Sequence, residues 1–193
     1  MIELVYANST GLLCDDHTLL FTDIGRDKKA GLFAAAADDE KMLYRYIAEF
    51  NRKVLKKGLR LIPISHKKNH FNLFLYRPDL LKKDLECELC RFILKSYQCY
   101  EGDMHQCLYA LRKRMQNNKD FPHEIGLFLG YPPEDVYGFI KHREVGCKHI
   151  GVWRVYDNVE RAKCTFSKYQ ACTKILSQRF LNGTPIEQLA VSI

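Results

Sequence analysis

The polar side chains best suited to chemistry gather in residues 121–140, which read FPHEIGLFLGYPPEDVYGFI. His123 and Glu124 open a predicted short helix after Pro122, where free backbone amides favour a bound anion. Glu124 is equally what favourable placement in the helix dipole predicts for a structural residue. No second histidine follows at the spacing of a zinc protease. The pair therefore supports two interpretations, a ligand site or an ordinary helix start.

Further along the chain, His142, Cys147 and His149 lie within eight residues. Imidazole and thiolate are ligands that transition metals prefer. A further ligand would come from elsewhere, and Cys172 is a candidate because it lies at the edge of the apolar stripe of its helix. The plainer interpretation is a polar loop with one half-buried cysteine.

Cys87 and Cys90 form a CxxC. Zinc requires a second ligand pair at matched spacing, and a redox site requires a thioredoxin-like setting. The sequence indicates neither, so two small hydrophobic side chains near the core are the plainer interpretation. A glycine-rich phosphate loop and a GxSxG motif are also missing from the sequence.

Composition narrows the class of protein. The chain has 193 residues, of which 47% are hydrophobic, and this predicts one folded domain over residues 1–193. Its eight cysteines are too few for a disulfide scaffold. No apolar run is long enough to span a membrane, and the N-terminus lacks the basic region of a signal peptide. We therefore expect a cytoplasmic protein with reduced thiols and no membrane partner.

Positive charge is concentrated in the middle of the chain. The net charge is +7, but residues 41–119 carry 18 basic and 7 acidic groups. This raises nucleic-acid binding through residues 41–119 as a second alternative function. A helix-turn-helix around Gly130 would read bases from the start of its second helix, where Glu134 and Asp135 would repel phosphate. We therefore disfavour nucleic acid and assign the charge mostly to the outer sides of amphipathic helices.

Apolar periodicity predicts several helices. One apolar stripe runs from Leu43 to Val54, with an N-cap at Asp38 or Asp39 and a stop at Gly58. The longest helix is predicted over 157–182, with an Asp157–Glu160 capping box. Two short helices are predicted between residues 121 and 142. A further helix is predicted from the apolar repeat of Met104, Cys107, Leu108, Leu111 and Met115.

Apolar runs predict fewer strands. Residues 59–65 and 71–76 read as a hairpin, and Pro63 places its first strand at a sheet edge or bulge. Residues 18–23 and 149–156 also read as strands. The order of elements predicts an α+β fold with a small, mainly antiparallel sheet of about four strands, covered by several helices and ending in a long C-terminal helix. An exposed edge leaves homodimerisation open.

The 121–140 stretch closely resembles the signature of an uncharacterised bacterial family, catalogued as a domain of unknown function. The similarity continues in register through 151–156, 169–173 and 182–184, and upstream through the Tyr-Arg-Pro of 76–78. It covers roughly residues 40–190. The first 38 or so residues diverge, because the His-Cys pair that opens the family is missing. The resemblance does not identify a reaction, and it leaves the cofactor unknown.

The resemblance does select residues that could share a site. Our leading expectation is a non-enzymatic protein that binds a small ligand or a partner around the 121–140 stretch, because no complete catalytic set is present. Its candidate ligand-binding residues are Arg77, His123, Glu124, Trp153 and Tyr156. The first alternative is a thiol–histidine metal or redox site.

That alternative would use Cys147, His123 and Cys172, which would have to lie within a few ångströms of one another. Asp135 also matches the family signature, and we expect it to share a surface with the candidate residues, but we assign it no role. The identity of any partner is open.

Overall fold

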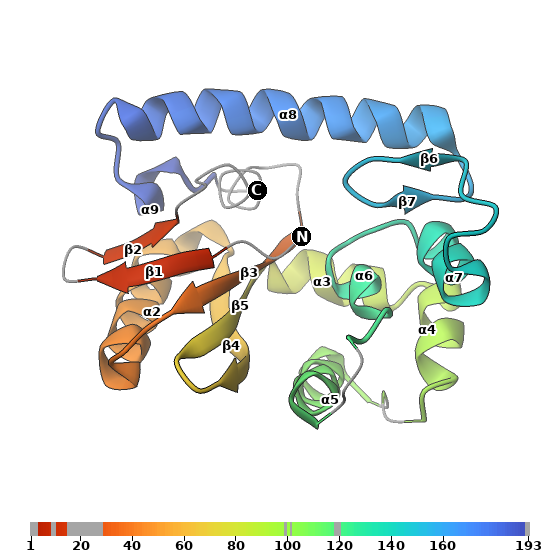
Figure 1. Cartoon of the computed structure of the whole chain (residues 1–193), viewed down its shortest axis with the longest axis horizontal. Helices are drawn as coiled ribbons and strands as arrows, with labels where there is room; N and C mark the ends of the chain where they lie inside the picture. Colours follow the sequence, from red (N-terminus) through yellow and green to blue (C-terminus); the bar gives the residue numbers. More distant parts are fainter. Residues whose placement is uncertain are drawn as a thin grey trace. The chain divides into compact units, whose positions relative to one another are not determined.

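The computed structural model describes residues 4–8, 11–14, 29–98, 100, 102–117 and 121–191. Its contacts divide the chain into two compact units. Unit 1 comprises Met1–Pro78 and Tyr169–Ile193, and unit 2 comprises Asp79–Lys168. The predicted α+β class is confirmed (Figure 1). The single-domain prediction stays a prediction.

Unit 1 is built on a five-stranded sheet in the order β2-β1-β3-β5-β4 (Figure 1). All neighbouring strands are antiparallel except the parallel pair β1 and β3, so the sheet is mainly antiparallel, as predicted. Its five described strands compare with the sheet of about four strands that we expected. They are β1 (Leu4–Asn8), β2 (Gly11–Cys14), β3 (Ala30–Ala36), β4 (Arg60–Lys67) and β5 (His70–Tyr76).

The β4–β5 hairpin confirms the predicted pair of strands. β4 is an edge strand, and its register against β5 shifts between Pro63 and Ser65. Because Pro63 has no amide hydrogen to donate to a ladder, an edge position with a bulge accommodates it. The exposed residues His66 and Lys67 near the end of β4 further disfavour pairing with another chain.

One sheet face packs against helices to form the core of unit 1. Alternate residues of β5, Phe71, Leu73 and Leu75, are fully buried there. Leu43 and Ile47 pack against them from α2 (Glu40–Val54), which confirms the predicted apolar stripe. The C-terminal part of α8 (Val159–Leu181) and α9 (Ile186–Leu189) complete the cluster with their own apolar side chains, Leu176 and Leu189.

The predicted ends of α2 are also observed. The Asp39 carboxylate accepts a hydrogen bond from the Met42 amide at 3.1 Å and therefore caps the helix. After α2, the single turn η1 (Leu55–Lys57) ends at Gly58, whose φ of +70° suits glycine.

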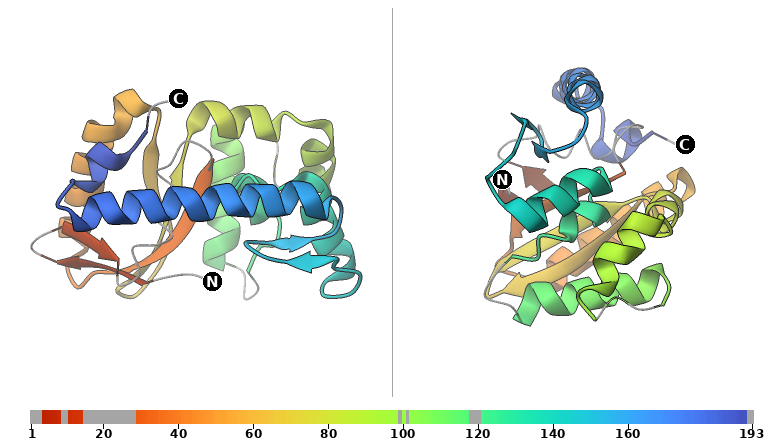
Figure 2. Two further views of the ribbon diagram at one scale, coloured as in Figure 1. Left: turned by 90° about the horizontal axis from the view of Figure 1, so that it is seen from above. Right: turned by 90° about the vertical axis from the view of Figure 1, so that its right-hand side faces the viewer.

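Unit 2 is mainly helical. It contains α5, whose Cys107, Leu108 and Leu111 are buried on the predicted stripe, and the two short helices predicted within 121–142. In Figure 2, α4 lies beside α7, in agreement with their contacts. The helices are α3 (Pro78–Leu85), α4 (Glu88–Lys95), α5 (Met104–Asn117), α6 (Ile125–Phe128), α7 (Pro133–His142) and the first part of α8.

Two predictions for this region were wrong in detail. Residues 149–156 form a tight hairpin of β6 (His149–Ile150) and β7 (Arg154–Val155) rather than one strand, because the chain bends at Gly151. A β-carbon at Gly151 would lie 2.1 Å from the Phe166 ring, so this bend requires glycine. The cap of α8 is Asn158, whose Oδ1 accepts from the Arg161 amide at 2.9 Å, rather than Asp157 with Glu160.

The predicted strand at 18–23 lies outside the described residues. None of the described helices is both long enough and apolar enough to cross a membrane.

We predict that Asp39→Ala lowers the free energy of unfolding by about 1 kcal/mol, because α2 loses its side-chain cap. The neighbouring Asp38→Ala is the matched control, since Asp38 is exposed and accepts only a 3.4 Å bond from Asn69. Urea denaturation measures both. Equal losses in the two variants would contradict the assigned cap.

Candidate functional site

Arg77 lies in unit 1, whereas His123, Glu124, Trp153 and Tyr156 lie in unit 2. The Arg77 side chain is 1% exposed, and its guanidinium donates to the carbonyls of Lys57 at 3.0 Å and Val191 at 2.8 Å. Burial lowers the pKa of this guanidinium. The arginine therefore joins η1 to the C-terminal segment, which is a structural role within unit 1.

Glu124 is a buried structural carboxylate. It is 0% exposed, and its Oε1 accepts from the Tyr100 hydroxyl at 2.8 Å and from Nε of Arg114. It forms no side-chain cap on α6, although it directly precedes that helix. The carboxylate therefore forms a buried ion pair with Arg114 and does not cap the helix, although the sequence suggested a role at the helix start.

Asp135, in the first turn of α7, holds three donors with one carboxylate. Oδ2 accepts from Trp153 Nε1 at 2.8 Å, and Oδ1 accepts from the amides of Tyr156 at 2.7 Å and Asp157 at 2.9 Å. Asp135 is only 3% exposed. This interaction, which we call the Asp135 clamp, fixes the β6–β7 hairpin and the start of α8 onto α7.

Aromatic packing supports the clamp. The Trp153 ring stacks on Tyr131 with centroids 5.0 Å apart and meets Phe166 edge-on at 4.5 Å. The Tyr156 ring packs directly on Gly138, where a β-carbon would lie 2.5 Å from the ring. Trp153 and Tyr156, predicted as ligand-binding residues, therefore act within unit 2 as supports for α7.

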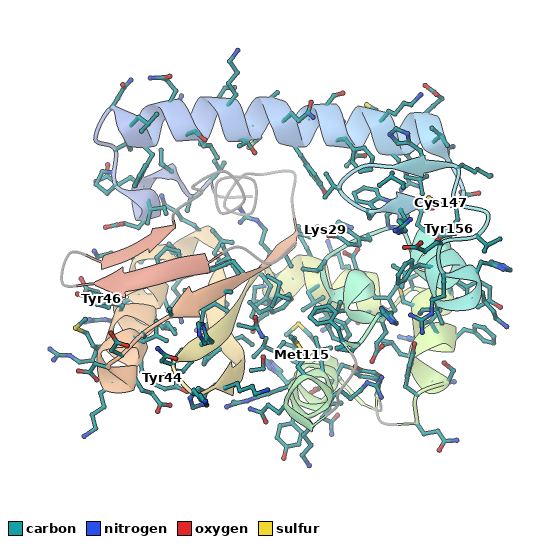
Figure 3. All side chains as sticks on the ribbon, viewed as in Figure 1. Lys29, Tyr44, Tyr46, Met115, Cys147 and Tyr156 are labelled. Carbon is teal, nitrogen blue, oxygen red and sulfur yellow. The ribbon has the colours of Figure 1, made fainter. Side chains whose placement is uncertain are left out.

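Tyr156 in turn holds the residue that ends α7. Its hydroxyl donates to the carbonyl of Arg143. Burial raises the pKa of this phenol, followed in effect by the neighbouring Cys147, so it remains a donor at neutral pH. Figure 3 shows Cys147 and Tyr156 close together beside α7.

Arg143 has an unusual backbone. Its φ is +55° and its ψ −119°, a region that side chains other than glycine rarely adopt. Its guanidinium lies over the Phe139 ring, 5.9 Å from the centroid. His123 meets the same ring edge-on at 5.1 Å. Two nitrogen-rich side chains therefore share one aromatic platform.

A second guanidinium lies on another aromatic ring of unit 2. The guanidinium of Arg114 lies over the Tyr97 ring, 4.6 Å from the centroid. Burial raises the pKa of Tyr97, with the charge of Glu124 adding to it, while Arg114 and Arg143 act in the opposite direction. Arg143 thus lies within electrostatic reach of Tyr97. We call the side chains of Tyr97, Arg114, His123, Phe139 and Arg143 the Arg143 site.

Of the predicted metal ligands, Cys172 belongs to unit 1, whereas His123 and Cys147 belong to unit 2. Cys172 packs against the core of unit 1, and the Cys147 thiol in unit 2 donates to the His149 carbonyl at 3.1 Å. Among the described residues, no group of three or more His, Cys, Asp and Glu side chains could hold a metal ion. The metal alternative gains no support from this arrangement.

Sequence reasoning identified His123 and missed four members of the site, namely Tyr97, Arg114, Phe139 and Arg143. Tyr97, Arg114 and Arg143 are ordinary residues of a basic chain, and their proximity depends on tertiary contacts between segments of unit 2 that are distant in sequence. The one available signal was the Glu124 carboxylate, which predicts a buried cationic partner when a glutamate is enclosed.

These features define an α+β protein whose unit 2 carries a cluster of cations and aromatic rings at the end of α7. The chain belongs to the family described as protein of unknown function (DUF3793), whose sequence profile matches residues 23–190. The match begins earlier than the residue near 40 at which the similarity was expected to start. No curated protein and no solved structure matches the chain.

We predict that Asp135→Ala lowers the free energy of unfolding by about 3 kcal/mol, because three donors lose their acceptor. Glu134→Ala is the matched control, because Glu134 is next to Asp135 in the sequence and its side chain is exposed. This variant should change the free energy of unfolding by less than about 0.5 kcal/mol. Calorimetry on both variants measures the difference. Similar losses would show that the clamp is not the stabilising contact.

Proposed function

We propose that this protein is a non-enzymatic binding protein whose unit 2 takes up a small anionic ligand, through a carboxylate or phosphate group, at the Arg143 site. The observation that carries the proposal is Arg143 itself. Its side chain is exposed, its backbone is held at a positive φ, and its guanidinium is seated on Phe139 beside His123.

The cost of this backbone supports a role in binding. A side chain held in such a region costs about 1–3 kcal/mol and persists only where the surroundings impose it. Here the Tyr156 hydroxyl holds the Arg143 carbonyl, and the Asp135 clamp holds the Tyr156 amide. The strain positions a cation in advance, which lowers the entropic cost of binding an anion.

The local charge balance favours an anion. Glu124 is buried against Arg114, and Glu144 is paired with Arg154 at 2.6 Å. Within the part of the chain that the structure describes, no carboxylate forms an ion pair with Arg143. A guanidinium offers paired donors that match the geometry of a carboxylate or a phosphate, and His123 adds a further nitrogen nearby.

The burial of Glu124 and Asp135 supports binding over catalysis. General acid–base chemistry would require a carboxylate that reaches a substrate. Glu124 and Asp135 are both buried and accept hydrogen bonds from the protein itself. We also place the protein in the cytosol, where its exposed Cys164 would remain reduced.

Two cations of the 41–119 region serve the fold of unit 1. Lys57 donates to the carbonyls of Glu187 at 2.9 Å and Ala190 at 2.8 Å, and Lys53 pairs with Glu187 at 2.8 Å. Both are occupied by the C-terminal segment, which weakens the nucleic-acid alternative further.

Substitution at Arg143 should separate binding from stability. We predict that Arg143→Gly raises the free energy of unfolding by about 0.5–1 kcal/mol, because relief of strain exceeds the entropic cost of glycine. The same variant should lose anion binding. Isothermal titration with inorganic phosphate, pyrophosphate and citrate, in chloride buffer, measures this binding, and we expect wild-type Kd values of about 0.1–1 mM for the preferred anion.

Two controls sharpen this test. Arg143→Ala removes the guanidinium but keeps the strain, so it should lose binding without gaining stability. Lys68→Gly relieves a positive φ of 56° in the β4–β5 turn of unit 1 and should leave anion affinity unchanged. The proposal fails if none of the anions binds, or if Arg143→Ala binds them as well as wild type. Preference among the three anions distinguishes a phosphate ligand from a carboxylate ligand.

A further inference from the structure

A second chemically capable feature of unit 2 lies at the start of α4. Cys87 is the N-cap residue, with a non-helical backbone of φ −58° and ψ 136°, and Cys90 is in the first turn. Cys87 is exposed, whereas Cys90 is 3% exposed. The expectation of two small hydrophobic residues near the core therefore describes Cys90 but not Cys87.

We propose that Cys87 and Cys90 form a reversible dithiol–disulfide pair, in which exposed Cys87 attacks and buried Cys90 resolves. Residues three apart in a helical turn have β-carbons about 5–6 Å apart, and a disulfide requires about 3.5–4.5 Å. The remaining movement is small, and Cys87 can make it because it lies outside the helix and makes no side-chain capping hydrogen bond.

The surroundings set the rate of this chemistry. Burial, and after it the adjacent Cys87 sulfur, raises the pKa of the Cys90 thiol to about 12. The nearby carboxylates of Asp84 and Glu134 act in the same direction. A setting that disfavours the thiolate slows attack by Cys90, so the disulfide should form slowly at neutral pH.

The reaction balances with a low-molecular-weight disulfide as the oxidant. The Cys87 thiolate attacks one sulfur of that disulfide, which forms a mixed disulfide and releases one thiolate. Cys90 then loses its proton and attacks the Cys87 sulfur, which closes the protein disulfide and releases the second thiolate. The protein pair loses two electrons and two protons, and the small disulfide becomes two thiols after protonation.

The direct test uses the wild-type chain, equilibrated in buffers of reduced and oxidised glutathione. Free thiols are blocked with an alkylating reagent, and the peptide that contains residues 87–90 is analysed by mass spectrometry. We expect that peptide to lose two hydrogens when oxidised glutathione is in excess, and to regain them when reduced glutathione is in excess. A pair that stays fully reduced and alkylated even in excess oxidised glutathione would overturn the proposal.

Variants then test the two assigned roles. Cys90→Ala should leave a glutathione adduct on Cys87 that persists at least about tenfold longer than in wild type. Cys164 is the matched control, because it is also exposed, and its adduct should persist equally in wild type and in Cys90→Ala. Equal persistence of the Cys87 adduct in both proteins would contradict the role of Cys90. Failure of the anion-binding proposal would leave this result unchanged, since the dithiol does not depend on Arg143.

Discussion

The structure of unit 2 depends on one buried carboxylate. Asp135 accepts hydrogen bonds from an indole and two backbone amides that lie 18 to 22 residues further along the chain. Because the buried Trp153 indole would otherwise be left without an acceptor, the contact brings the hairpin and the start of α8 to α7 together. The position of Tyr156, and through it of Arg143, follows from this contact.

Close packing in unit 2 also explains why two of its glycines cannot be replaced by larger residues. Gly138 receives the Tyr156 ring, and Gly151 receives the Phe166 ring, at distances that no β-carbon could tolerate. Aromatic side chains and the Asp135 clamp therefore hold unit 2 together where regular strands are short. Glu124 and Asp135, whose carboxylates look catalytic in the sequence, hold the fold of unit 2. The residue that we propose contacts the ligand is Arg143, which the sequence did not single out.

Local features of the sequence predicted local features of the fold. The stripe of α2, its cap at Asp39 and the stop at Gly58 depend on neighbouring residues, and all are observed. Pro63 similarly predicted an edge position or a bulge, and the structure has both. The strand β3 was not predicted, because its sequence AGLFAAA is rich in alanine, which has little preference for strands. Its place between β1 and β5 supplies what local preference does not.

The candidate site was predictable only in part. His123 was identified from its sequence neighbourhood, but its ring partner Phe139 comes from α7 and the cation on that ring, Arg143, directly follows α7. The positive φ of Arg143 has no sequence signal, since an arginine there normally indicates a plain helix end. The CxxC of Cys87 and Cys90 was evident from spacing, while their unequal burial depends on how α4 packs.

The central claim is that the Asp135 clamp imposes the strained backbone at Arg143. A double-mutant cycle of Asp135→Asn and Arg143→Gly, followed by the free energy of unfolding, tests it most directly. The account predicts that the stabilisation of about 0.5–1 kcal/mol from glycine at position 143 disappears in the Asp135→Asn background, because residue 143 can then relax by itself. An equal gain in both backgrounds would show that the end of α7 sets this conformation alone and would contradict the claim.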